Sequence, residues 1–171
     1  KRSIFAQQTG LSETASYLKE VFQAAGAQVI LDESYAAPFV MATFASAKAD
    51  AKTLIFYNHY DVQPADRDQP WTSDPFQLDI RDGYMYGRGV DDDKGHITAR
   101  LTAVEKYREA HGELPVNIIF LIEGAEESAS VDLEKYLSKY RPALVGADLL
   151  VWEQGKKKKK KQLEISGGTK G

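Results

Sequence analysis

Two short apolar segments constrain the fold of this chain more than any other feature. Thr53–His59 (TLIFYNH) and Val116–Ile122 (VNIIFLI) are rich in β-branched and aromatic residues. Nearly continuous apolar runs of this length are typical of strands that are buried on both faces, as in sheets covered by helices. The two segments therefore predict the central strands of an α/β fold.

Segments with helical spacing of apolar residues lie between the strand candidates. Leu11–Ala25 has its apolar residues on one helical face, with Ser12 as a plausible N-cap and Gly26 as a stop. Further helices are expected from about Lys94 to Ala110 and from about Val131 to Tyr140. The alternation predicts an α/β three-layer sandwich with a mixed, mainly parallel central sheet.

Shorter strand candidates complete this pattern. Asp82-Gly83 is a typical turn dipeptide and predicts a hairpin between the strand candidates on either side of it. The shorter strands are expected at Gln28–Asp32, Phe39–Ala45, Phe76–Ile80, Tyr84–Tyr86 and Leu149–Trp152.

Composition excludes several classes of protein. The 171 residues, of which 43% are hydrophobic, suit one domain with its own core. No apolar run approaches the roughly 20 residues that span a bilayer, so no membrane contact is expected. There is no cysteine, which excludes disulfides and thiolate metal sites and fits a cytoplasmic location. Six of the 22 basic residues form the run Lys156–Lys161, leaving 16 against 25 acidic residues, a balance that argues against nucleic acid as a partner.

Polar side chains that could bind a metal follow the predicted strands. Because ligands bind at the carboxyl ends of the strands in such sheets, residues at these ends are expected to share one site. Imidazole and carboxylate donors without thiolate suit zinc, and also cobalt or manganese. The candidates are His59, Asp61, Asp92, Glu126, Glu127 and Glu153.

Each candidate taken alone has a simpler explanation. His59 could be a structural histidine at a strand end, Asp91–Asp93 a solvated loop that caps a helix, and Glu153 an exposed strand terminus. The shared position at strand ends favours the metal site. Asp61, two residues after His59, could accept the second imidazole N–H, as carboxylates beside metal-bound histidines usually do.

Several motifs together carry a specific resemblance. The chain resembles the co-catalytic zinc exopeptidases and deacylases, a family that includes carnosinase, aminoacylase, bacterial dipeptidases and succinyl-diaminopimelate desuccinylase. The similarity spans about Leu11 to Gly171. The matching segments are Asn58–Pro64 (NHYDVQP), Trp71, Pro75-Phe76, Tyr86–Gly89 (YGRG), Asp92–Gly95 (DDKG), Glu123-Gly124 and Glu126-Glu127.

The resemblance implies a role for each candidate. His59 and Glu153 would bind one zinc ion, Glu127 the other, and Asp92 would bridge the two. Glu126 would be the general base and Asp61 would orient His59. The Asp92-Asp93 peptide would be cis, as in relatives.

The chain also departs from the family. Members are longer, with a lid or dimerisation domain and a final histidine ligand, so residues 1–171 are expected to be the N-terminal part of a catalytic domain. Neither His96 nor His111 sits at the position of the missing ligand. Residues 155–162 form a Lys-rich turn, expected to be a solvated hairpin tip, where relatives have a varied short turn.

The expected function is hydrolysis of a peptide or amide bond in small substrates, most simply dipeptides, by a metal-activated water. An N-acyl amino-acid deacylase would use the same residues. An inactive metal-binding fragment or scaffold is the alternative of a different class. A homodimer of the full-length protein through the missing domain is a further expectation.

Overall fold

The computed structural model describes residues 1–65, 70–153, 156–158 and 162–164, and its centre is a five-stranded sheet. Strands β6, β3 and β7 are parallel to one another, whereas β2 is antiparallel to both β6 and β1. The sheet is therefore mixed, with parallel central strands, as predicted. Its strands, in spatial order, are β1 (Gln28–Asp32), β2 (Phe39–Phe44), β6 (Asn117–Glu123), β3 (Thr53–His59) and β7 (Leu149–Val151).

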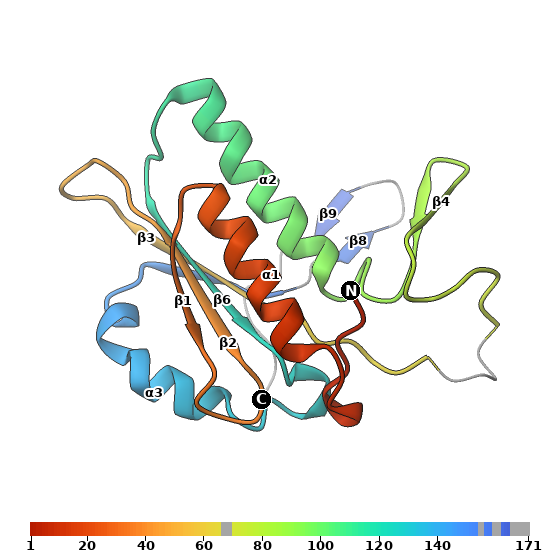
Figure 1. Cartoon of the computed structure of the whole chain (residues 1–171). Coiled ribbons are helices and arrows are strands. Elements are labelled where there is room, and N and C mark those ends of the chain that lie inside the picture. Colours follow the sequence, from red (N-terminus) through yellow and green to blue (C-terminus); the bar gives the residue numbers. More distant parts are fainter. Residues whose placement is uncertain (66–69, 154–155, 159–161, 165–171) are drawn as a thin grey trace.

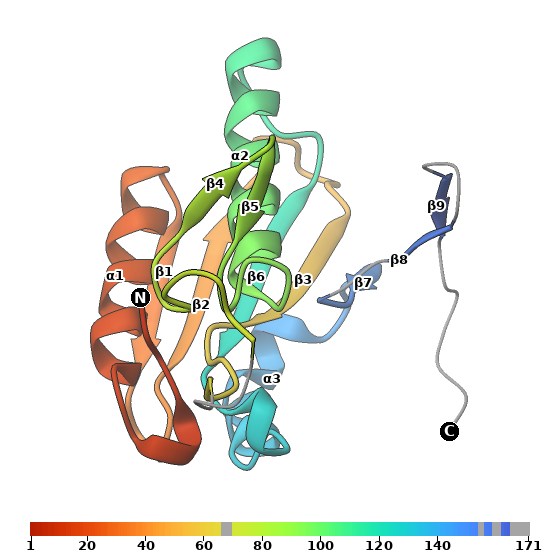
Figure 2. The same cartoon turned by 90° about the vertical axis from the view of Figure 1, so that its right-hand side faces the viewer.

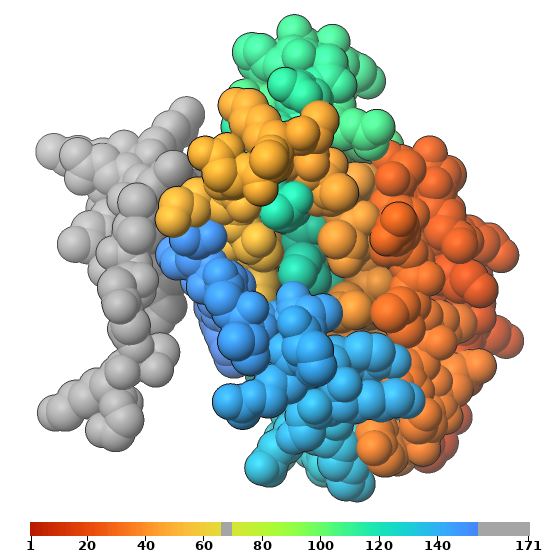
Figure 3. Space-filling model, turned by 90° about the vertical axis from the view of Figure 1, so that its left-hand side faces the viewer, coloured from red at the N-terminus to blue at the C-terminus, as the bar shows by residue number. Residues whose placement is uncertain are grey.

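Helices cover both faces of this sheet. The helices α1 (Leu11–Ala24) and α2 (Lys94–His111) lie side by side on one face (Figure 1 and Figure 2). Helix α3 (Leu133–Leu144) packs on the opposite face, which Figure 3 shows with α3 in blue. The predicted three-layer arrangement is confirmed.

Alternate residues of β6 pack into the two hydrophobic cores, one on each face of the sheet. Ile118, Phe120 and Ile122 pack toward α1 and α2, while Ile119 and Leu121 pack toward α3. This alternation follows from the two-residue period of a strand. It explains why the apolar run in this segment is continuous.

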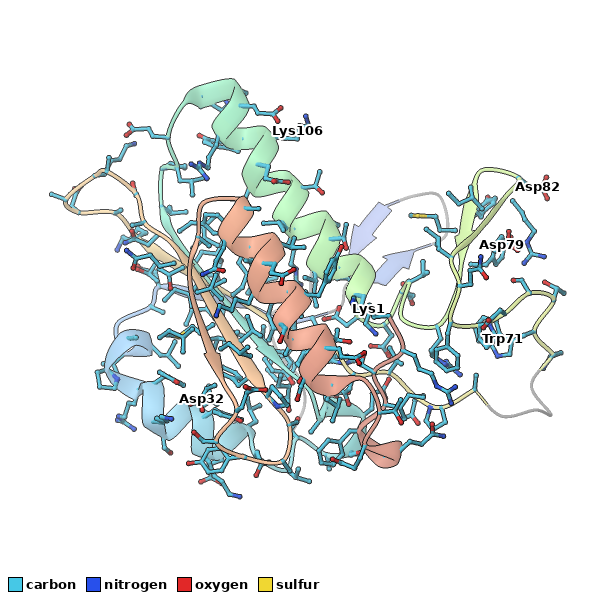
Figure 4. The ribbon with its side chains drawn as sticks, in the orientation of Figure 1. Lys1, Asp32, Trp71, Asp79, Asp82 and Lys106 are labelled. Carbon is cyan, nitrogen blue, oxygen red and sulfur yellow. The ribbon has the colours of Figure 1, made fainter. Side chains whose placement is uncertain are left out.

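Smaller elements lie outside the central sheet. Strands β4 (Asp79–Arg81) and β5 (Tyr84–Tyr86) form the predicted hairpin, with positive φ at both turn residues, Asp82 and Gly83. Figure 4 shows Asp79 and Asp82 on this projecting hairpin, far from Asp32. Short 3-10 helices, η1 and η2, occupy Phe5–Gln7 and Glu126–Ser128.

The Lys-rich segment is described in part. Strands β8 (Lys156–Lys158) and β9 (Gln162–Glu164) pair as an antiparallel ladder. Of the turn expected at residues 155–162, Lys156–Lys158 and Gln162 lie in these strands, whereas residues 155 and 159–161 lie outside the described residues, as does the terminal segment Ser166–Gly171. Among the helices of the described residues, none is both long and apolar enough to cross a membrane.

Three local expectations are wrong. Gly10, with a φ of 65°, precedes the first residue of α1, so Ser12 lies within the helix and is not its N-cap. Helix α3 runs from Leu133 to Leu144 and includes Pro142, whereas the expected helix ran from about Val131 to Tyr140. Strand β4 begins at Asp79, so residues 76–78 do not belong to the strand expected at Phe76–Ile80.

Candidate metal centre

The candidate residues come together at one edge of the sheet. His59 is the last residue of β3, and in the parallel ladder it lies opposite Glu123, the last residue of β6. Glu153 follows β7 by two residues. Because all three strands run in the same direction, their carboxyl ends bring these side chains to a common place.

His59 is the centre of this cluster. Its side chain is fully buried, and its ring nitrogens face four carboxylates. Nε2 lies 2.9 Å from Asp92 Oδ1, 3.7 Å from Glu126 Oε2 and 3.8 Å from Glu153 Oε2. Nδ1 lies 3.3 Å from Asp61 Oδ1. Carboxylates from four segments therefore surround one imidazole.

Asp61 joins His59 to the 3-10 helix η2. Its carboxylate is fully buried and accepts hydrogen bonds from the backbone N–H groups of Glu126 at 3.1 Å and Glu127 at 3.0 Å. Its backbone carbonyl lies 3.2 Å from His59 Nδ1. One residue therefore fixes both the imidazole and the start of η2.

Glu127 points to a different neighbour. Its Oε2 atom accepts a 2.7 Å hydrogen bond from Gln63 Nε2. In the described part of the chain, the ion pairs of His59 do not include Glu127. The structure thus places Glu127 beside the cluster through its backbone, with its carboxylate held by Gln63.

Asp93 binds the backbone of His59. It is fully buried, and its Oδ2 atom accepts hydrogen bonds from Asn58 Nδ2 at 2.6 Å and from the His59 backbone N–H at 3.1 Å. The Asp92-Asp93 peptide is cis, as the resemblance implied. Asp92 Oδ1 contacts His59 Nε2, and its neighbour Asp93 binds the backbone of β3.

The electrostatics of the cluster favour a bound cation. Burial acts to lower the pKa of His59, but Asp61, Asp93 and Glu126 outweigh burial and raise that pKa to about 10. Burial raises the pKa of Glu153 to about 7 and also raises the pKa of Glu126. The neighbouring carboxylates therefore stabilise positive charge at the imidazole, whereas burial destabilises negative charge on Glu153 and Glu126.

Some donor atoms of the cluster lie close enough together to share one metal ion. Two donors on one zinc ion, each at about 2.0–2.2 Å, lie at most roughly 4.4 Å apart. The separations from His59 Nε2 to Asp92 Oδ1 and Glu153 Oε2 both satisfy this limit. Glu153 Oε2 is also buried without a hydrogen-bond partner among the described residues. A buried carboxylate oxygen needs a partner, and a cation would supply one.

The side chains are nevertheless not arranged as a ligand set. Among the residues that the structure describes, no group of three or more His, Asp and Glu side chains could hold a metal ion as placed. His59 Nε2 contacts Asp92 Oδ1 directly at 2.9 Å, and the Glu127 carboxylate is hydrogen-bonded to Gln63. Small side-chain movements within the cluster would be required.

Sequence reasoning singled out the acids and the histidine but assigned no role to several residues that hold them. Asn58 and Gln63 lie within the recognised NHYDVQP segment, so the motif itself was a signal for them. Arg100 was missed, although it follows Ile97 by three positions and precedes Val104 by four, within the buried stripe of α2. A charged residue on such a stripe is a detectable signal.

The chain is similar in sequence to known dipeptidases. The human protein named Beta-Ala-His dipeptidase is 42% identical over 120 residues, which are 70% of this chain and 24% of that protein. The Cys-Gly metallodipeptidase of Saccharomyces cerevisiae is 38% identical over 104 residues, 60% of this chain and 21% of its own length. The chain therefore spans less than a quarter of the length of each of these curated relatives.

A solved structure extends the similarity to the fold. The M20 family metallo-carboxypeptidase Sso-CP2 of Sulfolobus solfataricus has a TM-score of 0.84 and 39% identity, covering 95% of this chain and 36% of that one. Residues 55–166 match the sequence profile of Peptidase family M20/M25/M40. This range holds every candidate residue of the cluster and more than half of the chain, so the protein belongs to Peptidase family M20/M25/M40.

Proposed function

We propose that the full-length protein is a metal-dependent hydrolase of small peptides, with dipeptides as its substrates, and that the His59 cluster belongs to its active centre. The observation that carries this proposal is the buried Glu153 Oε2 atom, which has no hydrogen-bond partner in the described part of the chain and lies 3.8 Å from His59 Nε2. Relatives whose names describe dipeptidases support the choice of substrate. Family membership supports the dependence on metal.

The proposed ligands divide between two zinc ions. His59 and Glu153 would hold one ion, Glu127 the other, and Asp92 would contact both. Asp92 Oδ1 is already 2.9 Å from His59 Nε2, and its side chain is about half exposed. Cobalt or manganese would suit the same oxygen and nitrogen donors. Glu127 would have to release Gln63 or share it.

Glu126 is the proposed general base. Its Oε2 atom lies 3.7 Å from His59 Nε2, and its side chain is partly accessible. Its backbone is fixed by Asp61, so the carboxylate can move without loss of its anchor. Glu126 would accept a proton from the attacking water and deliver it to the leaving amine, the two steps of general acid–base catalysis.

Asp61 is the proposed orienting group for His59. Its buried carboxylate and carbonyl both lie beside Nδ1, which leaves Nε2 to face the metal side of the cluster. Divalent ions, when bound, supply Lewis acidity for a water molecule and for the scissile carbonyl.

The proposal is tested on the full-length protein by metal analysis together with a panel of dipeptides and N-acyl amino acids. The expected result is bound divalent metal and hydrolysis of dipeptides, both lost in His59→Ala. Preferential cleavage of N-acyl amino acids would assign a deacylase on the same residues. Metal-free protein with undiminished activity would overturn the proposal.

Two further statements stay predictions of the sequence. A cytoplasmic location and a homodimer formed through a separate domain both concern the full-length protein. Size measurement of the purified protein, with and without that domain, tests the second of them.

A further inference from the structure

The pairing between β3 and β7 stops just before the candidate site. The parallel register runs through Leu54 with Leu149, Ile55 with Leu150 and Phe56 with Val151. Continuing it by two positions would set Tyr57 beside Trp152 and Asn58 beside Glu153. These are the residues at which the two strands lead into the His59 cluster.

The side chain of Arg100 spans this end of the ladder. From α2, its Nη1 atom donates to the Tyr57 carbonyl at 2.8 Å and to Asn58 Oδ1 at 2.9 Å. Its Nη2 atom donates to the carbonyl of Trp152 and, at 3.0 Å, to that of Glu153. One guanidinium therefore joins the two pairs of residues that the continued register would bring together.

We propose that Arg100 is a positioning residue that fixes Glu153 against His59, an inference that rests on the proposed function of this cluster. With its carbonyl bound by Arg100, Glu153 has its Oε1 atom 3.2 Å from the Trp152 indole N–H. Among the described residues its Oε2 atom has no hydrogen-bond partner, and it lies 3.8 Å from His59 Nε2. Arg100 thus fixes the backbone of Trp152 and Glu153, and the Trp152 indole N–H engages Oε1, so that Oε2 is the carboxylate oxygen that faces His59.

Aromatic contacts beside Arg100 stabilise its hydrogen bonds to the ends of β3 and β7. The Trp152 ring stacks on Tyr57 with centroids 4.1 Å apart, and the Arg100 guanidinium lies over the Phe56 ring at 5.0 Å. Both contacts restrict rotation at the point where β7 leaves the sheet. Aromatic stacking and cation–π contact favour a planar guanidinium over an ammonium group.

The same arginine reaches the opposite side of the cluster through Asn58. Asn58 accepts from Arg100 at its Oδ1 atom and donates from Nδ2 to Asp93, which in turn binds the His59 backbone N–H. Arg100 therefore ties together the ends of β3 and β7 and the start of its own helix. Lysine could not replace it, because one ammonium group cannot present a planar fork to acceptors on two strands.

The test is zinc affinity of the full-length protein, prepared metal-free and titrated with Zn²⁺ against a competing chelator. Arg100→Lys keeps the positive charge but loses the planar guanidinium that donates to both strands. We therefore expect zinc affinity to fall about 10-fold or more, as when a group that orients a metal ligand is lost. Arg108→Lys is the matched control. It makes the same change on the same helix, where Arg108 Nη1 donates to the Ala25 carbonyl, and should leave affinity within about twofold.

A double variant separates positioning from general loss of structure. If Arg100 acts through Glu153, Arg100→Lys should lower zinc affinity in the wild type but add little in a Glu153→Gln background, since coupled residues are not additive. Equal losses in both backgrounds, or no loss from Arg100→Lys, would overturn the positioning role. Unchanged affinity in Glu153→Gln alone would instead overturn the ligand assignment on which the role depends.

Thermal unfolding of each metal-free variant is measured in parallel. If Arg100→Lys does not unfold cooperatively, Arg100→Gln, which keeps a planar donor group, is taken through the same titrations. A loss of zinc affinity of at least 10-fold that disappears in the Glu153→Gln background supports the role in either variant. Independence from Glu153 contradicts it.

Discussion

Glu126 is held by Asp61 through its backbone and not through its side chain: the Asp61 Oδ1 atom accepts the Glu126 N–H at 3.1 Å. The Glu126 carboxylate meanwhile faces His59 Nε2 at 3.7 Å and is partly accessible. A change confined to that carboxylate should leave the anchor intact. The chemistry of Glu126 can therefore be tested apart from the integrity of the site.

Glu126→Gln should abolish most turnover while metal content stays near that of the wild type. The amide keeps the size of the side chain but cannot accept the proton, and loss of a general base costs about 100- to 10,000-fold in rate. Steady-state kinetics on a dipeptide and metal analysis of the same preparation measure both quantities. Retention of most activity would show that another group is the base.

Asp92→Ala should lose both metal ions, because the proposed bridging carboxylate contacts each of them. Asp91→Ala provides the control, since Asp91 is the adjacent acid and its side chain is 98% exposed. Metal stoichiometry after dialysis distinguishes the two. A full complement of metal in Asp92→Ala, or equal losses in both variants, would contradict the assignment.

Much of the fold follows from local sequence patterns. The ends of β3 match the predicted Thr53–His59, and α1 begins at the predicted Leu11, because strand and helix periodicity are properties of neighbouring residues. The continuation of α3 through Pro142 was not predicted, since it depends on packing against the sheet. Local patterns define elements, whereas contacts between distant segments decide where some of them end.

The candidate site shows the same division. The cluster at strand ends could be predicted, because parallel strands bring their carboxyl ends to one edge of a sheet. The role of Arg100 could not, since it depends on β3 and β7 meeting across nearly a hundred residues of sequence. The hydrogen bond from Gln63 to Glu127 likewise requires a loop and η2 to be placed together.

Asp32→Asn should destabilise the protein at neutral pH. Asp32 Oδ2 lies 2.6 Å from both Lys139 Nζ and the Tyr140 hydroxyl, and Oδ1 accepts hydrogen bonds from Ser34. Burial acts to raise the pKa of Asp32, but these hydrogen bonds outweigh it and hold the pKa well below its ordinary range. Losing the charged acceptor should cost roughly 1–3 kcal/mol of unfolding free energy.

This contribution should depend on pH in a defined direction. Because the native pKa of Asp32 is depressed, its stabilisation is present above the unfolded pKa of about 3.9 and is lost as pH falls through the lower native value. Denaturant unfolding at pH 7 and pH 3 should therefore show a smaller difference between wild type and Asp32→Asn at pH 3. Asp82→Asn, at the exposed hairpin turn, is the control and should have little effect at either pH. A difference that grows on acidification would contradict this account.

Gly124→Ala should disturb the segment that leads from β6 to η2. An added Cβ would lie 2.2 Å from the Tyr60 hydroxyl oxygen and 2.3 Å from its Cζ atom. Tyr60 is fully buried, and its hydroxyl donates to the Pro38 carbonyl at 2.7 Å, so the ring cannot easily move away. Overpacking of this kind costs about 1–3 kcal/mol. A Gly124→Ala protein with wild-type unfolding and metal affinity would show that the ring shifts freely.

The most direct test of the metal centre is anomalous diffraction at the zinc absorption edge from crystals of the full-length protein grown with Zn²⁺. The account predicts an anomalous peak about 2.0–2.2 Å from both His59 Nε2 and a Glu153 carboxylate oxygen, with Asp92 also within bonding distance. A second peak is predicted between Asp92 and Glu127. Fully occupied zinc bound elsewhere, with none at His59 and Glu153, would contradict the account.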